Sequence, residues 1–576
     1  MNQKLENILN VSLDATEDEL RKADSLSTGY NWRDNTWEII VKYSGSLESI
    51  RNRYNVYIKE LLNYYAIIVA DKATIELISQ EDVIDYVEKP KSLYYQIERT
   101  KTAACVGNVR ADGNILSGKG VIVGVIDTGI DIFDNAFRNS DGTTRILNIY
   151  DQTTGEKYDK QSIDEYIKLN EDLSGGTFSY DNAPGVDNIM HGTDVSYIAA
   201  GSLGVAYEAD IIAVKMGYSI NNQFPRTTSL MDAIDYVIRK AIEYRKPVAV
   251  NISYGCNYGA HNGNTLLESF IDDISKSYRC VICVGSGNEA DKAIHFGGII
   301  NTGQVQTAYL SVGEYQSAMD IQIWKNYWDT IDVMLINPRG EQIGIITEGK
   351  INRYETYNTE IITLLGEPSP YNIYQEIYIN LIPKTDYILS GIWQIVLMAG
   401  NIRAGEYNIW LPSSQALGYA TAFNNPTADG TITIPATARN CIAVGAYNAY
   451  TNSYAAFSGR GFDNSIRNVN AGVKPDITAP GVDISIARQR GNDITYRNVT
   501  GTSYAVPVVT GAAALLMQWG IVMGNDRFMY GEKLKAALID GSKPVGLAGI
   551  TGNDNHPDPR TGWGAVCLMN TLNKIL

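Results

Sequence analysis

The sequence predicts an α/β fold in which a parallel β-sheet is covered by helices on both faces. It also predicts a small α+β module before this core and a β-sandwich inserted into it. Short apolar runs alternate with helical stretches in the core, strands and helices alternate in the N-terminal module, and one long stretch shows strands without convincing helices. The predicted segments are 1–96 for the module, 97–303 and 415–576 for the two parts of the core, and 304–414 for the insertion.

The N-terminal module shows the order β-α-β-α-β. Residues 37–43 alternate β-branched and aromatic side chains with polar ones, as a half-buried strand does, and residues 46–54 follow with a helical pattern. So short a succession of strands and helices predicts a compact α+β unit. The other predicted elements are a strand at 62–70, a helix at 72–80 and a strand at 83–89.

The core is predicted from apolar runs that contain almost no polar residues. Strands of this kind are buried on both faces, as in a parallel sheet covered by helices. In such an open α/β sheet the active site lies beyond the carboxyl ends of the strands. The runs are KGVIVGVIDTGI, ADIIAVKM, PVAVNISYG, CVICVGSGN and NCIAVGAY, and the helical stretches are 228–245, 264–278, 503–520 and 531–541.

The inserted segment, 304–414, has a different pattern. Strand-like stretches such as MDIQIWK, IYQEIYINLI and GIWQIVLMA are separated by Pro and Gly residues. This spacing is typical of a β-sandwich or jelly roll.

Composition excludes several classes of protein. Lys and Arg number 48 against 64 Asp and Glu, a net charge of −16, which disfavours nucleic acid as a partner. The N-terminus has no basic region followed by an apolar one, and no apolar stretch is long enough to span a membrane, so we expect a soluble chain without a signal peptide. The six cysteines are scattered; Cys280 and Cys283 form a C-x-x-C without a second ligand pair, so metal or redox chemistry is not expected there.

Three residues of the core form the pattern of a nucleophilic catalytic site. Asp127 directly follows a buried strand in VIVGVIDTGID, His191 begins a helix in HGTDVSYIAAG, and Ser503 stands at a helix N-terminus in GTSYAVPVVTG. A serine nucleophile needs a base to take its proton and an acid to orient that base. Taken singly, the three have structural explanations, as a turn residue, a core histidine and a helix N-cap. Their combination indicates catalysis.

These segments resemble the signature blocks of the subtilase family, in the order Asp, His, Ser. The resemblance covers about 118–300 and 415–576 and implies that Asp127 is the acid, His191 the base and Ser503 the nucleophile. It also implies that Asn288, in VGSGNEA, donates to the oxyanion. The substrate-binding residues that it implies are Ser253, Tyr254, Gly255, Gly285, Ser286 and Gly287.

The chain departs from the family pattern next to two of these residues. Asp194 stands where the family usually has a second histidine, and Tyr504 and Val506 replace the common Met and Ser after the nucleophile, while Pro507 is retained. Every chemical role remains filled. The sequence shows no recognisable cluster of calcium ligands, so no metal or other cofactor is expected.

The N-terminal module is similar to the propeptide that subtilases commonly carry. With the β insertion between the oxyanion and serine blocks, and without a signal peptide, the chain most resembles the Csp germination proteases of clostridial spores. That resemblance implies a jelly-roll insertion, a self-cleaved prodomain that acts as a bound inhibitor, and a protein substrate, the precursor of a spore cortex hydrolase. We predict autoprocessing at Gln96–Ile97 and a spore-associated location.

Three other functions are compatible with parts of the pattern. An aspartic protease would need a second D-T-G or D-S-G, which is missing, and an α/β-hydrolase would use Ser503 with His556 but lacks the last glycine of G-x-S-x-G and leaves Asp127 and His191 unexplained. The third is a silent pseudoprotease that acts as a binding scaffold with the prodomain over its site.

Overall fold

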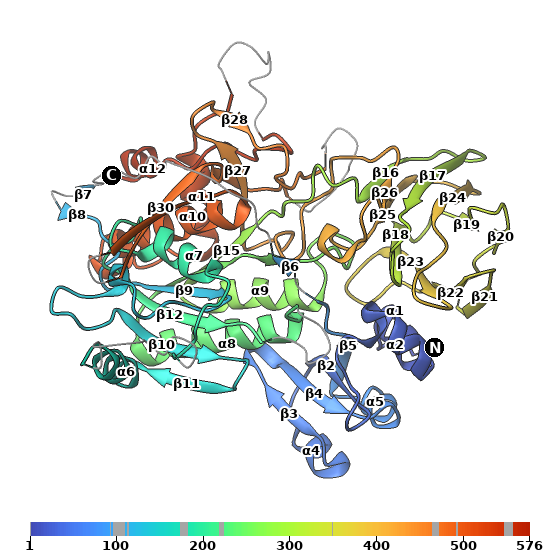
Figure 1. Ribbon diagram of the computed structural model, residues 1–576, viewed down its shortest axis with the longest axis horizontal. Helices are drawn as coiled ribbons and strands as arrows, with labels where there is room; N and C mark the ends of the chain where they lie inside the picture. The colour runs from blue at the N-terminus through green and yellow to red at the C-terminus, as the bar shows by residue number, and fades with distance from the viewer. Residues whose placement is uncertain are drawn as a thin grey trace.

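The computed structural model describes residues 2–92, 94–95, 110–111, 114–172, 183–217, 224–347, 349–462, 472–490, 493–546 and 557–576. These residues form an N-terminal domain, an α/β core and a β-sandwich. In Figure 1 the core lies on the left, the sandwich on the right, and the N-terminal domain below and between them.

The N-terminal domain is built on a five-stranded antiparallel sheet of order β1-β2-β4-β3, with β5 paired to β2. The strands and helices predicted between residues 37 and 89 are all present, although the strand expected from residue 62 starts later because Leu62–Tyr64 form a turn of 3-10 helix. The elements are β1 (Tyr30–Asn31), β2 (Thr36–Tyr43), α4 (Glu48–Tyr54), β3 (Tyr57–Glu60), β4 (Tyr65–Ala70), α5 (Lys72–Ile78) and β5 (Ile84–Glu88).

Three short helices precede this sheet, and the sequence analysis did not predict them. Their apolar side chains share one hydrophobic core with the sandwich: Leu9 and Leu26 belong to the same buried cluster as Tyr378. Isolated helices of this length are marginal in water, so packing on the sandwich stabilises them. They are α1 (Asn7–Asp14), α2 (Glu17–Lys22) and α3 (Asp24–Ser27).

The core contains the predicted parallel sheet, of order β11-β10-β12-β9-β13-β15-β27-β28, with β29 also paired to β27. The pairs from β10 to β27 are parallel, and β11 and β28 add antiparallel edges. Every residue of β9, β13 and β15 is buried, as their continuous apolar runs predict. The strands are β9 (Ile122–Asp127), β10 (Ile146–Asp151), β11 (Glu156–Asp159), β12 (Asp210–Lys215), β13 (Val248–Ile252), β15 (Cys280–Gly285), β27 (Ile442–Asn448), β28 (Ser453–Tyr454) and β29 (Ile477–Pro480).

Helices cover both faces of this sheet. α7 (His191–Ala200) and α10 (Thr502–Met517) share a hydrophobic core on one face, and α8 (Thr227–Tyr244) and α9 (Leu266–Ser277) share another on the opposite face. Within the described chain, residues 502–522 are long and apolar enough to cross a membrane, but 89% of their most apolar stretch is buried inside the fold, as in a core helix. The remaining helices are α6 (Lys160–Asp172), α11 (Gly531–Asp540) and α12 (Leu568–Ile575).

The insertion is a sandwich of two antiparallel sheets, β16-β25-β18-β23-β22-β21 and β20-β19-β24-β17-β26. It extends beyond the predicted bounds 304–414, because β16 pairs with β25 and β26 pairs with β17. The strands are β16 (His295–Ile299), β17 (Val305–Val312), β18 (Met319–Asn326), β19 (Ile331–Ile336), β20 (Gln342–Ile343), β21 (Ile351–Glu355), β22 (Thr359–Leu365), β23 (Tyr374–Pro383), β24 (Gly391–Ala399), β25 (Glu406–Trp410) and β26 (Ala422–Phe423).

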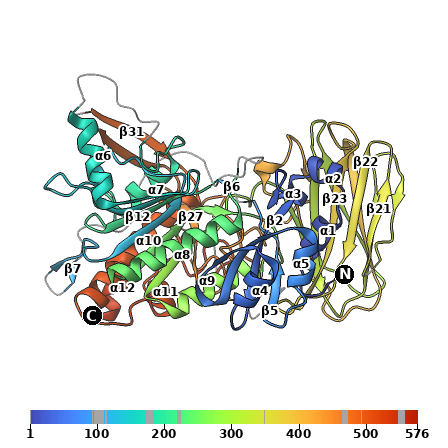
Figure 2. The ribbon, with the colours of Figure 1, turned by 90° about the horizontal axis from the view of Figure 1, so that it is seen from below.

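The N-terminal domain touches both other parts of the molecule, as Figure 2 shows from below. Its sheet packs on the core, where the Tyr65 hydroxyl donates to Asp273 at 3.2 Å, and Arg353 of the sandwich pairs with Asp14 at 2.8 Å. The N-terminal domain is therefore fixed between the other two parts.

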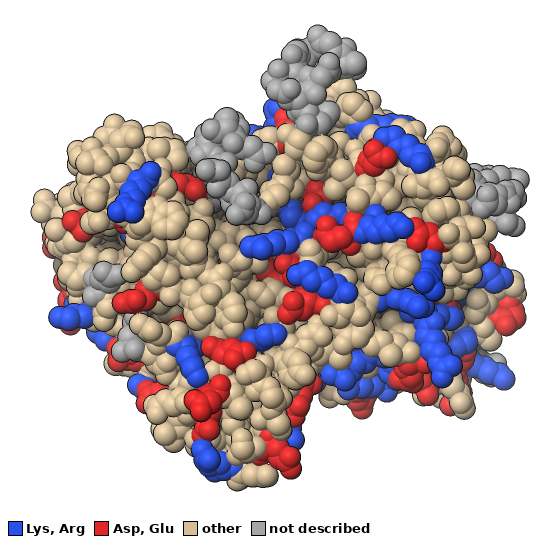
Figure 3. Space-filling view, turned by 180° about the vertical axis from the view of Figure 1, so that it is seen from behind, with Lys and Arg blue, Asp and Glu red and all other residues tan. Residues whose placement is uncertain are grey.

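On the face seen in Figure 3, charged side chains of both signs are spread over the core, whereas the sandwich shows few.

Candidate active site

Asp127 and His191 lie side by side at the carboxyl end of the sheet. Asp127 ends β9, which runs between β12 and β13, and His191 begins α7. Their Oδ1 and Nδ1 atoms are 2.6 Å apart, and the amide of Thr128 donates to the same carboxylate oxygen at 2.8 Å. An imidazole held in this way through Nδ1 keeps Nε2 for proton exchange.

The surroundings of the His191 ring favour its protonated form. Burial, the largest single effect, disfavours the imidazolium, but the charge and hydrogen bond of Asp127 outweigh it together with the charges of Asp187 and Asp194. The pKa of His191 is therefore raised above its ordinary value. The Nε2 atom is buried and has no hydrogen-bond partner among the described residues. The ring therefore combines a fixed orientation with an unused nitrogen.

A glycine lets α7 approach the strand closely. The amide of Gly192 donates to the Thr128 hydroxyl at 2.9 Å. A Cβ atom at Gly192 would lie 2.3 Å from the Gly129 carbonyl oxygen and 2.9 Å from the Cβ of Asp127. Any larger residue would push α7, and His191 with it, away from the acid.

Ser503 lies in the first turn of α10 and is fully buried. α10 packs against α7, and the ring of the next residue, Tyr504, lies 5.3 Å from the His191 ring between centroids. The Ser253 hydroxyl donates to the Ser503 carbonyl at 3.3 Å, which ties α10 to the end of β13. The first amides of a helix have no acceptor within it, and its dipole favours negative charge there.

Asn288 presents an amide donor beside the same turn. Its Oδ1 accepts hydrogen bonds from the backbone amide of Thr502 at 3.0 Å and from the Thr502 hydroxyl at 3.2 Å, which fixes the orientation of the carboxamide. Its Nδ2 is buried and has no hydrogen-bond partner in the described part of the chain. A buried donor held in this way can bind the oxyanion of a tetrahedral intermediate.

The predicted substrate-binding strand pairs with the tail of the N-terminal domain, which is the segment that follows β5 and contains β6 (Tyr94–Tyr95). β14 (Tyr254–Gly255) pairs antiparallel with β6, with Tyr254 opposite Tyr95. The tail is also bridged to the core between Ser92 and Arg226. An extended peptide thus lies along the edge of the site.

Gly285, Ser286 and Gly287 form the end of β15 and the turn into Asn288. Gly287 has φ +98°, and a Cβ there would meet Thr433 at 2.6 Å, so only glycine fits. The Ser286 hydroxyl is buried 3.3 Å from the Ser458 hydroxyl. Its backbone amide donates to the Val444 carbonyl at 2.9 Å and its carbonyl accepts from the Thr433 amide at 3.0 Å, so Ser286 is held by the core on all sides.

Asp187, which was not among the predicted site residues, joins the acid segment to the base helix. Its Oδ1 accepts from the Thr128 hydroxyl and the Met190 amide, each at 2.7 Å, and its Oδ2 accepts from the amide and hydroxyl of Thr193 at 2.8 and 2.7 Å. Asp187 is fully buried. The signal for it was an Asp shortly before the helix that His191 begins, a position from which a short polar side chain can bind the first amides of a helix.

The two cysteines of the C-x-x-C lie in β15 and are fully buried. Burial raises the pKa of Cys280 and of Cys283 to about 12. Among the residues that the structure describes, no group of three or more His, Cys, Asp and Glu side chains could hold a metal ion. Gln96, Ile97 and His556 lie outside the described residues.

The parallel sheet, the hydrogen-bonded Asp127–His191 pair and the buried Ser503 define the class of serine peptidases with the order Asp, His, Ser. Comparison with protein families matches the subtilase family over residues 118–372 and 390–564, and the Csp protease B prodomain over residues 3–91. The chain therefore belongs to the subtilase family of serine peptidases, and its N-terminal domain is a Csp-type prodomain.

Individual proteins are similar to this chain to different extents. The structure of the CspB protease of Clostridium perfringens matches with 34% identity and a TM-score of 0.72, over 80% of this chain and 94% of that chain. The subtilase-type proteinase RRT12 of Saccharomyces cerevisiae is 32% identical over 128 residues, 22% of this chain. The subtilisin-like protease 10 of Arthroderma otae is 34% identical over 118 residues, 20% of this chain. These alignments span only 23% and 26% of the two curated relatives.

Proposed function

We propose that the chain is an endopeptidase with Ser503 as nucleophile, His191 as base and Asp127 as the acid that orients the base. The observation that carries this proposal is the 2.6 Å contact between His191 and Asp127, which leaves Nε2 of the ring unused beside the first turn of α10. Ser503 attacks the scissile carbonyl while His191 takes its proton and then gives it to the leaving amine. Asn288 Nδ2 and the Ser503 amide bind the oxyanion.

The prodomain is, in this proposal, both the first substrate and a bound inhibitor. The pairing of β6 with β14 supports it, because a substrate adds as an extended strand in the same way. Gln96 is the next residue of the chain after β6, so the bond Gln96–Ile97 is the proposed cleavage site.

The physiological role that we propose is limited proteolysis of a precursor protein during germination, such as a spore cortex hydrolase zymogen, by a spore-associated enzyme. Its support is the resemblance to Csp germination proteases, together with the match of residues 3–91 to the Csp protease B prodomain and the likeness to the C. perfringens CspB protease. Incubation of the purified chain with such a zymogen, followed by sequencing of the products, tests this step. An uncut zymogen, in the presence of an enzyme that labels with an active-site probe, would refute it.

The catalytic proposal is tested with a fluorophosphonate probe and the Ser503→Ala variant. We expect the wild type to be labelled, and N-terminal sequencing to find a new terminus at Ile97. The Ser503→Ala variant should stay unlabelled and uncut.

If the wild type is neither labelled nor cut, the chain is a silent pseudoprotease. If Ser503→Ala is cut as well as the wild type is, self-processing is refuted and another protease makes the cut.

A further inference from the structure

A second set of charged side chains lies behind His191. Asp194, three residues further along α7, is fully buried and faces two arginines of the hairpin formed by β30 (Ile484–Arg490) and β31 (Asp493–Val499). Arg488 donates from Nε to Oδ1 of Asp194 at 3.0 Å, and its Nη2 contacts the same oxygen. Arg497 places Nη2 at 2.5 Å from Oδ2. Two guanidinium groups thus neutralise one carboxylate at the position where the family pattern has histidine.

Arg488 holds the first turn of α7 at two points. Besides Asp194, it donates from Nη2 to the carbonyl of Met190 at 2.9 Å. Met190 directly precedes His191 and has φ +67° and ψ 10°, in the left-handed region that residues other than glycine rarely adopt. Such a conformation persists only where its surroundings hold it. Here Asp187 binds the Met190 amide and Arg488 binds its carbonyl.

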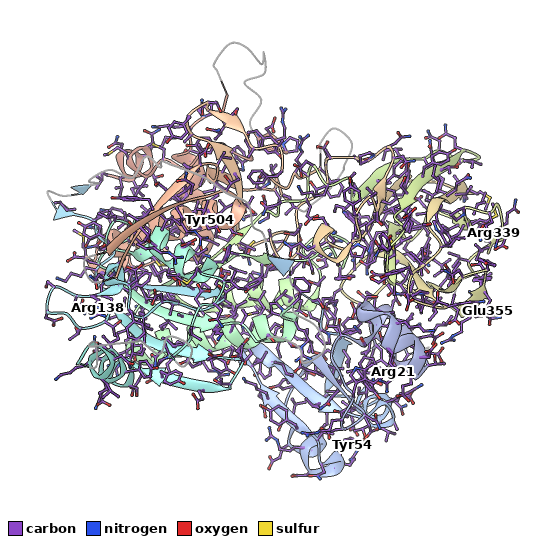
Figure 4. All side chains as sticks on the ribbon, in the orientation of Figure 1. Arg21, Tyr54, Arg138, Arg339, Glu355 and Tyr504 are labelled. Atoms are coloured by element: carbon purple, nitrogen blue, oxygen red, sulfur yellow. The ribbon has the colours of Figure 1, made fainter. Side chains whose placement is uncertain are left out.

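Arg497 links the same carboxylate to the helix of the nucleophile. A hydrogen bond with Arg497 lowers the pKa of the Tyr504 hydroxyl, although burial, the larger effect, leaves that pKa raised. Tyr504 lies in the core half of the molecule (Figure 4), directly after Ser503 and with its ring against His191. Two of the positions at which the chain departs from the family pattern, Asp194 and Tyr504, are therefore joined through one arginine.

We propose that Asp194, Arg488 and Arg497 are positioning residues, through which the β30–β31 hairpin holds His191 in line with Ser503. None of them touches the reacting atoms, so none is a catalytic residue. The inference rests on the triad proposed above. A different explanation is that the same contacts only fasten the hairpin to α7. Both explanations expect a loss of stability on mutation, but only the first expects a change in how His191 titrates.

The charges around His191 set the direction of that change. Asp127 faces the ring from β9, Asp187 from the segment before α7 and Asp194 from α7 itself, and all three carboxylates favour the imidazolium. Arg488 and Arg497 face Asp194 from the hairpin, and Tyr504 faces the ring from α10. Loss of the Asp194 charge leaves both arginines unopposed, so the pKa of His191 falls. Loss of Arg497 leaves the Asp194 carboxylate less neutralised, so the pKa of His191 rises.

The test is the pH dependence of fluorophosphonate labelling in the full chain. Asp194→Asn should move the midpoint to lower pH by about one unit, and Arg497→Gln should move it to higher pH. Arg488→Gln should also lower the plateau rate, on the order of 100-fold, because it releases the turn that carries the base. Compared with Arg488→Gln, Arg488→Lys should restore the charge but not the contact with Met190. It should therefore restore only part of the labelling rate.

Arg339→Gln is the matched control, because it removes an arginine at the far end of the sandwich (Figure 4). Arg497 has a side chain that is 41% exposed, so Arg497→Gln should fold even where Arg488→Gln does not. If the midpoints of Asp194→Asn and Arg497→Gln equal that of Arg339→Gln, the positioning role is refuted and the contacts are structural. If the wild type and Arg339→Gln are both unlabelled, the proposed catalytic function fails together with this inference.

Discussion

Glu289, the residue that follows Asn288, accepts hydrogen bonds from the backbone amide of Ser414 at 3.1 Å and from its hydroxyl at 3.2 Å. Ser414 lies in the connection between β25 and β26, two strands of the sandwich. The glutamate is buried, and burial raises its pKa. The loop that carries the oxyanion donor is thus anchored to the inserted domain.

Replacement of Glu289 by alanine should loosen this anchor. A fully buried amide left without an acceptor costs about 1–3 kcal/mol; Ser414 is only half-buried, so we expect the free energy of unfolding in urea denaturation to fall by about 1 kcal/mol. Glu289→Gln keeps one acceptor oxygen, so its free energy of unfolding should fall less than that of the alanine variant. Equal stabilities of the alanine variant and the wild type would show that Ser414 finds another partner.

Asn288→Ala should slow labelling of Ser503 by about 10²- to 10³-fold, equivalent to about 2.7–4 kcal/mol of transition-state stabilisation. The reason is the loss of the Nδ2 donor. Thr502→Ala is the matched control: it removes the 3.2 Å hydroxyl contact and leaves the 3.0 Å amide contact that orients Asn288. A rate for Asn288→Ala close to that of the control would exclude Asn288 as an oxyanion donor.

Asp187→Asn should weaken both the fold and the site. The carboxylate accepts four hydrogen bonds, and an amide nitrogen in place of one oxygen would point a donor at two other donors. Hydrogen bonds to a charged group contribute about 1.5–3 kcal/mol each, so we expect a lower melting temperature together with slower labelling. Thr128→Val removes one of the four donors and also the acceptor of the Gly192 amide, but it should have the smaller effect because the bonds of Met190 and Thr193 to Asp187 remain. The same melting temperature for Asp187→Asn and the wild type would contradict this.

Glu376 makes the stability of the prodomain interface depend on pH. It accepts hydrogen bonds from Gln322 at 3.0 Å and from Asn7 of α1 at 3.2 Å. Burial, with a further contribution from Glu6, raises the pKa of Glu376 from its ordinary value of 4.5 to about 8. Between these values the folded state binds a proton that the unfolded state has released. This contribution to stability is therefore present at low pH and is lost as the pH rises through about 8.

The measurement is the melting temperature of Glu376→Gln against that of the wild type from acid to alkaline pH. Because glutamine cannot ionise, the melting temperature of the variant should increase relative to that of the wild type as the pH rises. A constant difference across the range would show that Glu376 is not the titrating group.

The core and the candidate site could be predicted to a large extent because their signals are local. β9, β13 and β15 are unbroken apolar runs, and Asp127, His191 and Ser503 each stand in a short motif. The contact between Asp127 and His191, in contrast, depends on a strand and a helix whose contacting residues are 64 positions apart in the sequence. The place of Asp187 before α7 indicates only that it binds the first amides of that helix; its link to the acid segment depends on Thr128, which lies 59 residues away.

Several of the missed elements of the fold depend on partners that are distant in the sequence, although β10 and β11 form a local hairpin. α2 does have a local signal, a capping box between Thr16 and Glu19, but a six-residue helix is stable only against the sandwich. β16 contains the pair Gly297–Gly298, which weakens any strand pattern, and forms because β25 pairs with it. β26 has only two residues.

The hydrophobic core that α1–α3 share with the sandwich has a consequence for refolding. While the bond between the prodomain and the protease is uncut, the two parts belong to one polypeptide, and their contacts form within one molecule. Once the tail is cut, the same contacts join two separate chains, and their reassembly after denaturation becomes a second-order reaction whose yield depends on protein concentration. A cut molecule that has been unfolded and diluted would therefore recover its structure less readily than one that has never been cut.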